Sequence, residues 1–207
     1  MCVMFTMICG CTALRPETIP QPNFYSLDHV QTDVRPLPPA PASAPTLIIS
    51  PTHAAAGFDS QRIIYMRQPH KPEYYAYNEW VDTPARMLAP LIVNAIEHSR
   101  AFRAVIQMPS PAAGELRLDT EVVRLQHEFL SQPSRVRFTL RAYIVNSATR
   151  RVLTSHEFDA LIVTTSEDPY GGVVAANQAV SNVLEELATF CVETIASIRS
   201  TPGALSR

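Results

Sequence analysis

Three long alternating segments in the second half of the chain constrain its fold more than any other feature. Residues 116–122 alternate between inner and charged outer positions, and the phase then slips by one residue before the alternation continues to 129. Residues 136–144 and 152–163 follow after short connections at 131–134 and 146–151. A period of two predicts strands with one buried face, and the slip predicts a β-bulge. The short connections predict an antiparallel meander.

Two segments have helical periodicity instead. Residues 173–198 place Val180, Leu184, Leu187 and Cys191 on one stripe, which predicts a long amphipathic helix packed against the sheet. A loop through Pro169, Gly171 and Gly172 is expected before it.

The other predicted helix begins at Pro84, with Asp82 or Thr83 as its N-cap. Pro90 conflicts with this helix, because an interior proline costs about 3 kcal/mol. The helix is therefore expected to kink at Pro90 or to begin later.

Four further segments, at 24–28, 46–50, 61–67 and 102–107, have the composition of short strands. Residues 34–46 are rich in proline and alanine and are expected to form a linker or loop. The order of elements predicts a single α/β domain, in which two main helices pack on a mixed sheet that contains the antiparallel meander.

Composition excludes several classes of function. The 207 residues carry a net charge of −2 without a run of Lys or Arg, so nucleic acid is not an expected partner. The sequence contains no P-loop, no G-x-G-x-x-G and no G-x-S-x-G motif, so no enzyme activity or cofactor is predicted. His127 falls on an apolar strand face, where a hydrogen-bonded core histidine is the favoured interpretation. Charged residues on the outer face of the meander, such as Arg137 and Glu121, are expected to form ion pairs with one another.

The cysteines do not have the spacing of a metal site. Cys9 and Cys11 are separated by one residue, and no nearby histidine has ligand spacing, so no metal is predicted. Cys191 lies on the apolar stripe of the long helix, where a thiol packs as a small hydrophobe.

The residues before Cys11 instead have the pattern of a lipoprotein processing signal. Ile8 stands three residues before Cys11, followed by Cys9 and Gly10, as in a bacterial lipobox. In this interpretation Cys11 receives the lipid anchor after residues 1–10 are removed. A complete signal has a basic start and an apolar core of about 7–15 residues. We therefore expect 1–10 to be a truncated signal peptide, and the alternative is a short apolar tail.

The sequence after Cys11 suits a membrane tether. Residues 11–22 are polar and proline-rich, which predicts an extended segment. Thr12 follows the cysteine where inner-membrane lipoproteins carry Asp, so the outer membrane is expected. The predicted organisation is a signal at 1–10, a tether at 11–22, an auxiliary α/β domain at 23–200 and a tail at 201–207.

Aromatic residues gather just before the first helix. They are a candidate interface for a partner or a second copy, since Tyr and Trp are enriched at interfaces. Packing of a strand beside the first helix is an equal alternative. The candidate residues, with the arginine among them, are Tyr65, Arg67, Tyr75, Tyr77 and Trp80.

Taken together, these segments resemble the ABC-type transport auxiliary lipoprotein family, which includes the paraquat-inducible (PqiC-like) lipoproteins. The resemblance rests on the lipobox, on FYSLD at 24–28, on the segment 63–105 and on the C-terminal helix. Within 63–105 it is carried by Tyr65 with Arg67, Tyr75 or Tyr77, Trp80, Pro84, and Phe102 with Val105.

The resemblance implies a fold similar to the N-terminal domain of TolB and a non-enzymatic role without cofactors. It implies a periplasmic protein anchored to the outer membrane that serves an MCE-domain lipid transporter driven by an ABC ATPase, in support of envelope integrity. A homo-oligomer is compatible with it. The alternative function is a periplasmic assembly scaffold of a TolB-like envelope or secretion machine. Neither the lipid nor its direction of transport follows from the sequence.

Overall fold

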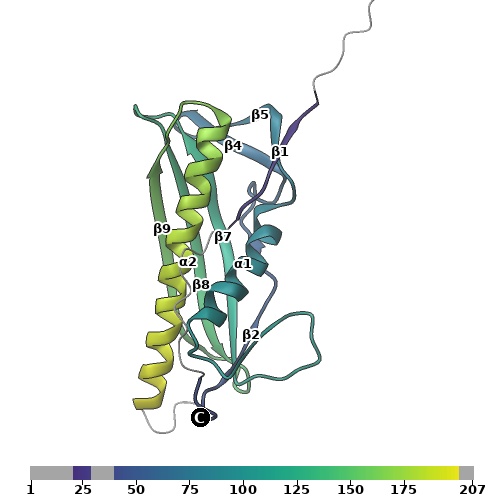
Figure 1. Ribbon diagram of the computed structural model, residues 1–207, viewed down its shortest axis with the longest axis vertical. Coiled ribbons are helices and arrows are strands. Elements are labelled where there is room, and N and C mark those ends of the chain that lie inside the picture. Colours follow the sequence, from purple (N-terminus) through teal and green to yellow (C-terminus); the bar gives the residue numbers. More distant parts are fainter. Residues whose placement is uncertain (1–20, 29–39, 201–207) are drawn as a thin grey trace, which may run out of the picture.

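A nine-stranded mixed sheet with two helices packed on one face forms the domain in the computed structural model, which describes residues 21–28 and 40–200 (Figure 1). The elements in chain order are β1 (Asn23–Tyr25), β2 (Thr46–Ile49), β3 (His53–Ala54), β4 (Arg62–Gln68), β5 (Lys71–Trp80), α1 (Pro84–His98), β6 (Ala104–Gln107), β7 (Leu116–Glu128), β8 (Arg135–Asn146), β9 (Val152–Val163) and α2 (Pro169–Ser200).

Strand β7 organises the sheet. One of its edges pairs along nearly its whole length with β8, and β9 follows beside β8, both antiparallel. Its other edge pairs in turn with β2, β3 and β4, all parallel. The order continues from β2 to β6, and from β4 through β5 to β1. The expected meander and the mixed α/β sheet are confirmed.

The predicted β-bulge is also present. The pairing of β7 with β8 shifts register between Val122 and Arg124. Leu118 and Val122 before the shift, and Leu125 and His127 after it, are all buried. The extra residue thus keeps both halves of a 13-residue strand on the helix-covered side.

The core lies between this side of the sheet and the two helices. Leu88, Ile92 and Ile96 of α1 and Leu184 and Leu187 of α2 are fully buried. Cys191 is a free, buried thiol, as expected, and burial raises its pKa to about 12. The thiol therefore acts as a small apolar group at neutral pH.

The opposite face of the meander is polar and carries the expected ion pairs. Arg141 of β8 bridges Glu121 of β7 and Glu157 of β9 at 3.1 and 2.7 Å. Arg137 in the same way contacts Glu128 and Asp159 at 3.1 and 2.7 Å. Arg137 and Arg141 of the central strand β8 are thus each paired with carboxylates on both sides.

Besides the two-residue strand β3, which the sequence did not predict, the structure corrects the expected elements in three places. Residues 71–80 form a ten-residue strand, β5, which the sequence interpretation did not assign. α1 runs continuously from Pro84 to His98 with the exposed Pro90 inside it, so it does not begin late.

The third correction concerns the glycines before the long helix. Gly171 and Gly172 belong to the first turn of α2 and not to a loop. The Asp168 carboxylate accepts a hydrogen bond of 2.7 Å from the Gly171 N–H, and Pro169 is the first helical residue. This is an N-cap with proline at the first position, a strong helix start.

Candidate functional site

The sequence-predicted aromatic residues divide between surface and core. Tyr65 of β4 and Tyr75 of β5 are half-buried neighbours with ring centroids 4.5 Å apart, and Phe129 meets Tyr65 edge-on at 6.1 Å. Tyr77 is 50% exposed, whereas Trp80 is 3% exposed and belongs to the core. The structure therefore brings Tyr65 and Tyr75 together and leaves Trp80 without surface to offer a partner.

Arg67 lies at the outer side of this aromatic group. Its guanidinium forms an ion pair with Glu73 across the β4–β5 hairpin and lies 5.5 Å from the Tyr65 ring centroid. The hydrogen bond from Arg67 holds the pKa of Glu73 below its usual range. The exposed part of the predicted interface thus consists of Tyr77 and of Arg67, which is paired with Glu73 and lies against the Tyr65 ring.

Beneath these rings lies a buried polar network around His127. Nε2 of His127 is 2.9 Å from the Ser134 hydroxyl, and Nδ1 is 3.1 Å from the Tyr75 hydroxyl. The Ser134 hydroxyl is also 2.7 Å from that of Thr164. These groups come from β7, the β7–β8 connection, β5 and the segment after β9. The network therefore joins the hairpin, the meander and the segment that leads into α2.

The electrostatics of the network follow from its burial. Desolvation lowers the pKa of His127 from 6.5 to about 4, so the ring is neutral at physiological pH. Burial likewise raises the pKa of Tyr75. Glu167 accepts the backbone N–H of Ser134 at 2.8 Å, which holds the pKa of this carboxylate down.

A serine beside a histidine raises the question of catalysis. Ser134 is 0% exposed and His127 is 2% exposed, so a substrate has no access to the pair. The Ser134 hydroxyl is also engaged by Thr164. The prediction of a hydrogen-bonded core histidine is confirmed, and the network has a structural role in this state of the molecule.

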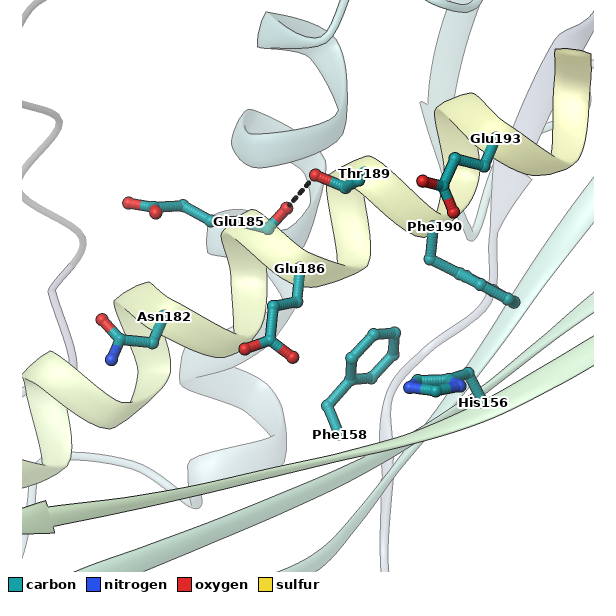
Figure 2. Close-up of a pocket in the computed structure, with 8 residues that line it drawn as sticks. All are labelled: His156, Phe158, Asn182, Glu185, Glu186, Thr189, Phe190 and Glu193. Atoms are coloured by element: carbon teal, nitrogen blue, oxygen red, sulfur yellow. Dashed lines mark hydrogen bonds between the residues drawn. The ribbon is translucent and has the colours of Figure 1, made fainter.

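Sequence reasoning missed a hollow between β9 and α2, which we call the β9–α2 groove. Its volume is about 550 Å³, and it is lined by His156 and Phe158 of β9 and by Asn182, Glu185, Glu186, Thr189, Phe190 and Glu193 of α2 (Figure 2). In β9, His156 and Phe158 lie on the side of the strand that faces α2. No sequence signal, however, shows that α2 would leave space above them.

The part of the chain that the structure describes contains no group of three or more His, Cys, Asp or Glu side chains able to hold a metal ion. Within 21–28 and 40–200, neither helix is both long and apolar enough to cross a membrane. The predicted lipobox Ile8, Cys9 and Gly10 and the anchor Cys11 lie outside the described residues.

The sequence of this domain matches a known protein family. The family model of the ABC-type transport auxiliary lipoprotein component matches residues 25–188, and the chain belongs to this family. This match confirms the resemblance inferred from the sequence. No curated protein matches the chain in sequence.

Solved structures agree on the fold. A crystal structure of a Xanthomonas campestris protein of the DUF330 family is 24% identical, with a TM-score of 0.75, and the match covers 86% of this chain and 99% of that one. The hypothetical protein CT253 of Chlamydia trachomatis is 7% identical, with a TM-score of 0.53, over 75% of this chain and 99% of that one. Both likenesses concern the architecture of the domain alone.

Proposed function

We propose that this protein is a non-enzymatic auxiliary subunit of an MCE/ABC-type intermembrane lipid transport system, held on the periplasmic side of the outer membrane by a lipid on Cys11. The family match over residues 25–188 carries the proposal, because it covers nearly the whole folded domain. The ATPase and permease activities would belong to other subunits, in agreement with a chain that has no nucleotide-binding motif.

The position of β1 supports anchoring through the N-terminus. β1 begins at Asn23 on an edge of the sheet, beside β5. The twelve residues from Cys11 to Pro22 can reach at most about 40 Å. A domain attached in this way stays close to the membrane surface but can change its orientation to meet a partner.

The interior of the domain supports a role without catalysis. Ser134, whose hydroxyl is hydrogen-bonded to the His127 ring, is enclosed together with it. The two partners of such a pair must reach a substrate to do chemistry. Two surface features are suited to binding a protein: the face formed by Tyr65, Arg67 and Tyr77, which we call the tyrosine–arginine face, and the β9–α2 groove.

The anchor is tested by changing Cys11 in the gene expressed from its natural start. The Cys11→Ala protein is expected to move from the membrane fraction to the soluble periplasm, because the thiol is the atom that would carry the lipid. Cys9→Ala is the matched control and should remain in the membrane fraction. Retention of the Cys11→Ala protein in the outer membrane would contradict the anchor.

The transport role is tested by purifying the protein from gently solubilised envelopes. An MCE-domain protein is expected to co-purify, and Arg67→Ala should reduce its recovery if the tyrosine–arginine face forms part of the contact. Recovery of Tol or secretion components in place of an MCE protein would favour the assembly-scaffold function and would contradict our proposal.

A further inference from the structure

Strand β9 presents a long unpaired edge. It pairs with β8 and, among the strands that the structure describes, with no other. Its twelve residues, VLTSHEFDALIV, include neither proline nor lysine. Natural proteins commonly protect edges with those residues, or with bulges or short strands, because free N–H and C=O groups are a template for another strand. The register shift in its pairing with β8 lies near the start of the strand, at Val152–Thr154, so the rest of this long edge is regular and suited to accept another strand.

The β9–α2 groove lies on the helix side of this edge. His156 and Phe158 of β9 form its floor together with Phe190 of α2. The ring centroids of Phe158 and Phe190 are 5.8 Å apart, as are those of His156 and Phe190. Figure 2 shows the carboxylates of Glu186 and Glu193 on the same side of α2 as these rings, whereas Glu185 is directed away from them. A strand added to β9 would therefore place every second side chain against aromatic rings and carboxylates.

The charge on the two sides of β9 is different. On the outer side, Glu157 is paired with Arg141, and Asp159 is paired with Arg137. On the groove side, neither Glu186 nor Glu193 forms an ion pair within the described part of the chain. Negative charge without a partner thus lies beside the free edge on the groove side only.

We propose that the β9 edge and the β9–α2 groove bind an extended segment of a partner protein, which adds to β9 as a strand and carries Lys or Arg at alternate positions opposite Glu186 and Glu193. These two residues are about 10.5 Å apart along the helix axis. Side chains on one face of a strand recur every 6.8 Å or so, which brings successive basic groups within reach of both carboxylates. This surface does not depend on the anchor or on which transporter the domain serves.

The probe for this site is a synthetic nonapeptide, TKTVTKTKT, whose alternate residues are Lys or Val. It is titrated into the isotope-labelled full chain carrying Cys11→Ala and followed by NMR. Saturable shifts are expected at residues 154–160 and 182–193, and hydrogen exchange of β9 amides should slow on binding. The same peptide with Glu for each Lys should bind at least tenfold more weakly.

Two changes separate strand pairing from general attraction between charges. The double variant Glu186→Gln/Glu193→Gln should weaken binding of the nonapeptide at least fivefold. Glu97→Gln removes an exposed carboxylate from α1 and should leave binding unchanged. The peptide TKPVPKTKT keeps all three lysines but lacks two backbone donors, so it should bind at least fivefold more weakly.

Several results would overturn the proposal. They are the absence of saturable binding, shifts confined to other elements, and equal binding by the double variant when its circular dichroism is unchanged. Sedimentation that shows a second copy of this chain on the β9 edge would assign the edge to self-association and would equally overturn it. Loss of membrane anchoring in Cys11→Ala has no bearing on these outcomes, so this test stands apart from that of the proposed function.

Discussion

The packing around Gly172 leaves no room for a larger side chain. Gly172 lies in the first turn of α2, where an added Cβ would be 2.5 Å from Nδ1 of His127. The ring cannot move away easily, because Ser134 and Tyr75 hold both of its nitrogens. Although alanine is the better helix former, we expect Gly172→Ala to lower the free energy of unfolding by about 1–3 kcal/mol, measured by urea denaturation.

A control for this change lies on the same helix. Gln178→Ala alters an exposed side chain and should change the free energy of unfolding by no more than about 0.5 kcal/mol. If Gly172→Ala unfolded at the same urea concentration as the natural protein, the tight packing of α2 on His127 would be disproved.

The burial of His127 makes the free energy of unfolding depend on pH. The pKa of His127 is about 4 in the folded protein and about 6.5 when unfolded, so folding favours the neutral ring. The stabilisation is complete above about pH 6.5 and is lost as the pH falls towards 4. From about pH 7 to about pH 4.5, we expect the natural protein to lose about 2 kcal/mol more than His127→Gln, by urea denaturation at both pH values. Equal losses in the two proteins would show that His127 does not titrate in this way.

At the residue scale, the sequence predicted whether a side chain is buried but not which other side chains it contacts. The strand alternation placed His127 on the inner face, and its burial follows from that. Tyr75 lies 52 residues away in the chain, and it reaches the ring only because β4 and β5 pair beside β7. Such contacts depend on strand order, which one sequence does not determine. Trp80 is an interface candidate by its proximity in sequence, yet its side chain is 3% exposed and belongs to the core.

The helix α1 contains a proline that its own backbone does not favour. Pro90 is exposed and has no N–H to donate to the carbonyl of Arg86, one turn earlier. The helix persists because Leu88, Ile92 and Ile96 are buried against the core. We expect Pro90→Ala to raise the free energy of unfolding by about 1–3 kcal/mol, measured by thermal and urea denaturation.

Asn94→Ala is the matched change on α1, at an exposed position without proline. It should raise stability by only a few tenths of a kcal/mol, roughly the difference in helix propensity. A Pro90→Ala protein that is less stable than the natural one would show that the proline stabilises the domain by restricting the unfolded chain.

Among the elements, regular periodicity decided what could be predicted. β7, β8 and β9 alternate over 12 or 13 residues, and their pairing followed from short connections. β5 was not assigned, since Pro72 and an irregular pairing with β4 interrupt any simple alternation. The start of α2 was placed four residues late, because paired glycines usually indicate a loop. Here they are required by close contacts with Ser166 and His127.

At the scale of the whole molecule, the segment that carries β1, residues 23–28, is part of the folded domain. Leu27 is 4% exposed within the core. The Asp28 N–H donates to Asn177 of α2 at 2.6 Å, and Asn177 donates in turn to the Ser26 carbonyl at 3.2 Å. We expect a chain without residues 1–39 to be at least about 2 kcal/mol less stable, because it loses a buried leucine and these bonds. The measurement is urea denaturation of the purified protein.

The matched control removes only residues 1–20, so that β1 and Leu27 remain. This shorter deletion should leave the free energy of unfolding within about 0.5 kcal/mol of the intact chain. If both deletions had the same small effect, the N-terminal strand would be dispensable for folding.

The attachment of β1 also determines how the domain responds to mechanical load. β1 runs parallel to β5, with Asn23 beside Asn78 and Tyr25 beside Trp80. Tension applied to the N-terminus along the strand would shear these pairs together and then reach the Asn177 contact on α2. Tension applied across the sheet would instead peel the pairs apart one at a time. In the anchored arrangement that we propose, this junction would therefore resist tension along the strand more strongly than tension across the sheet.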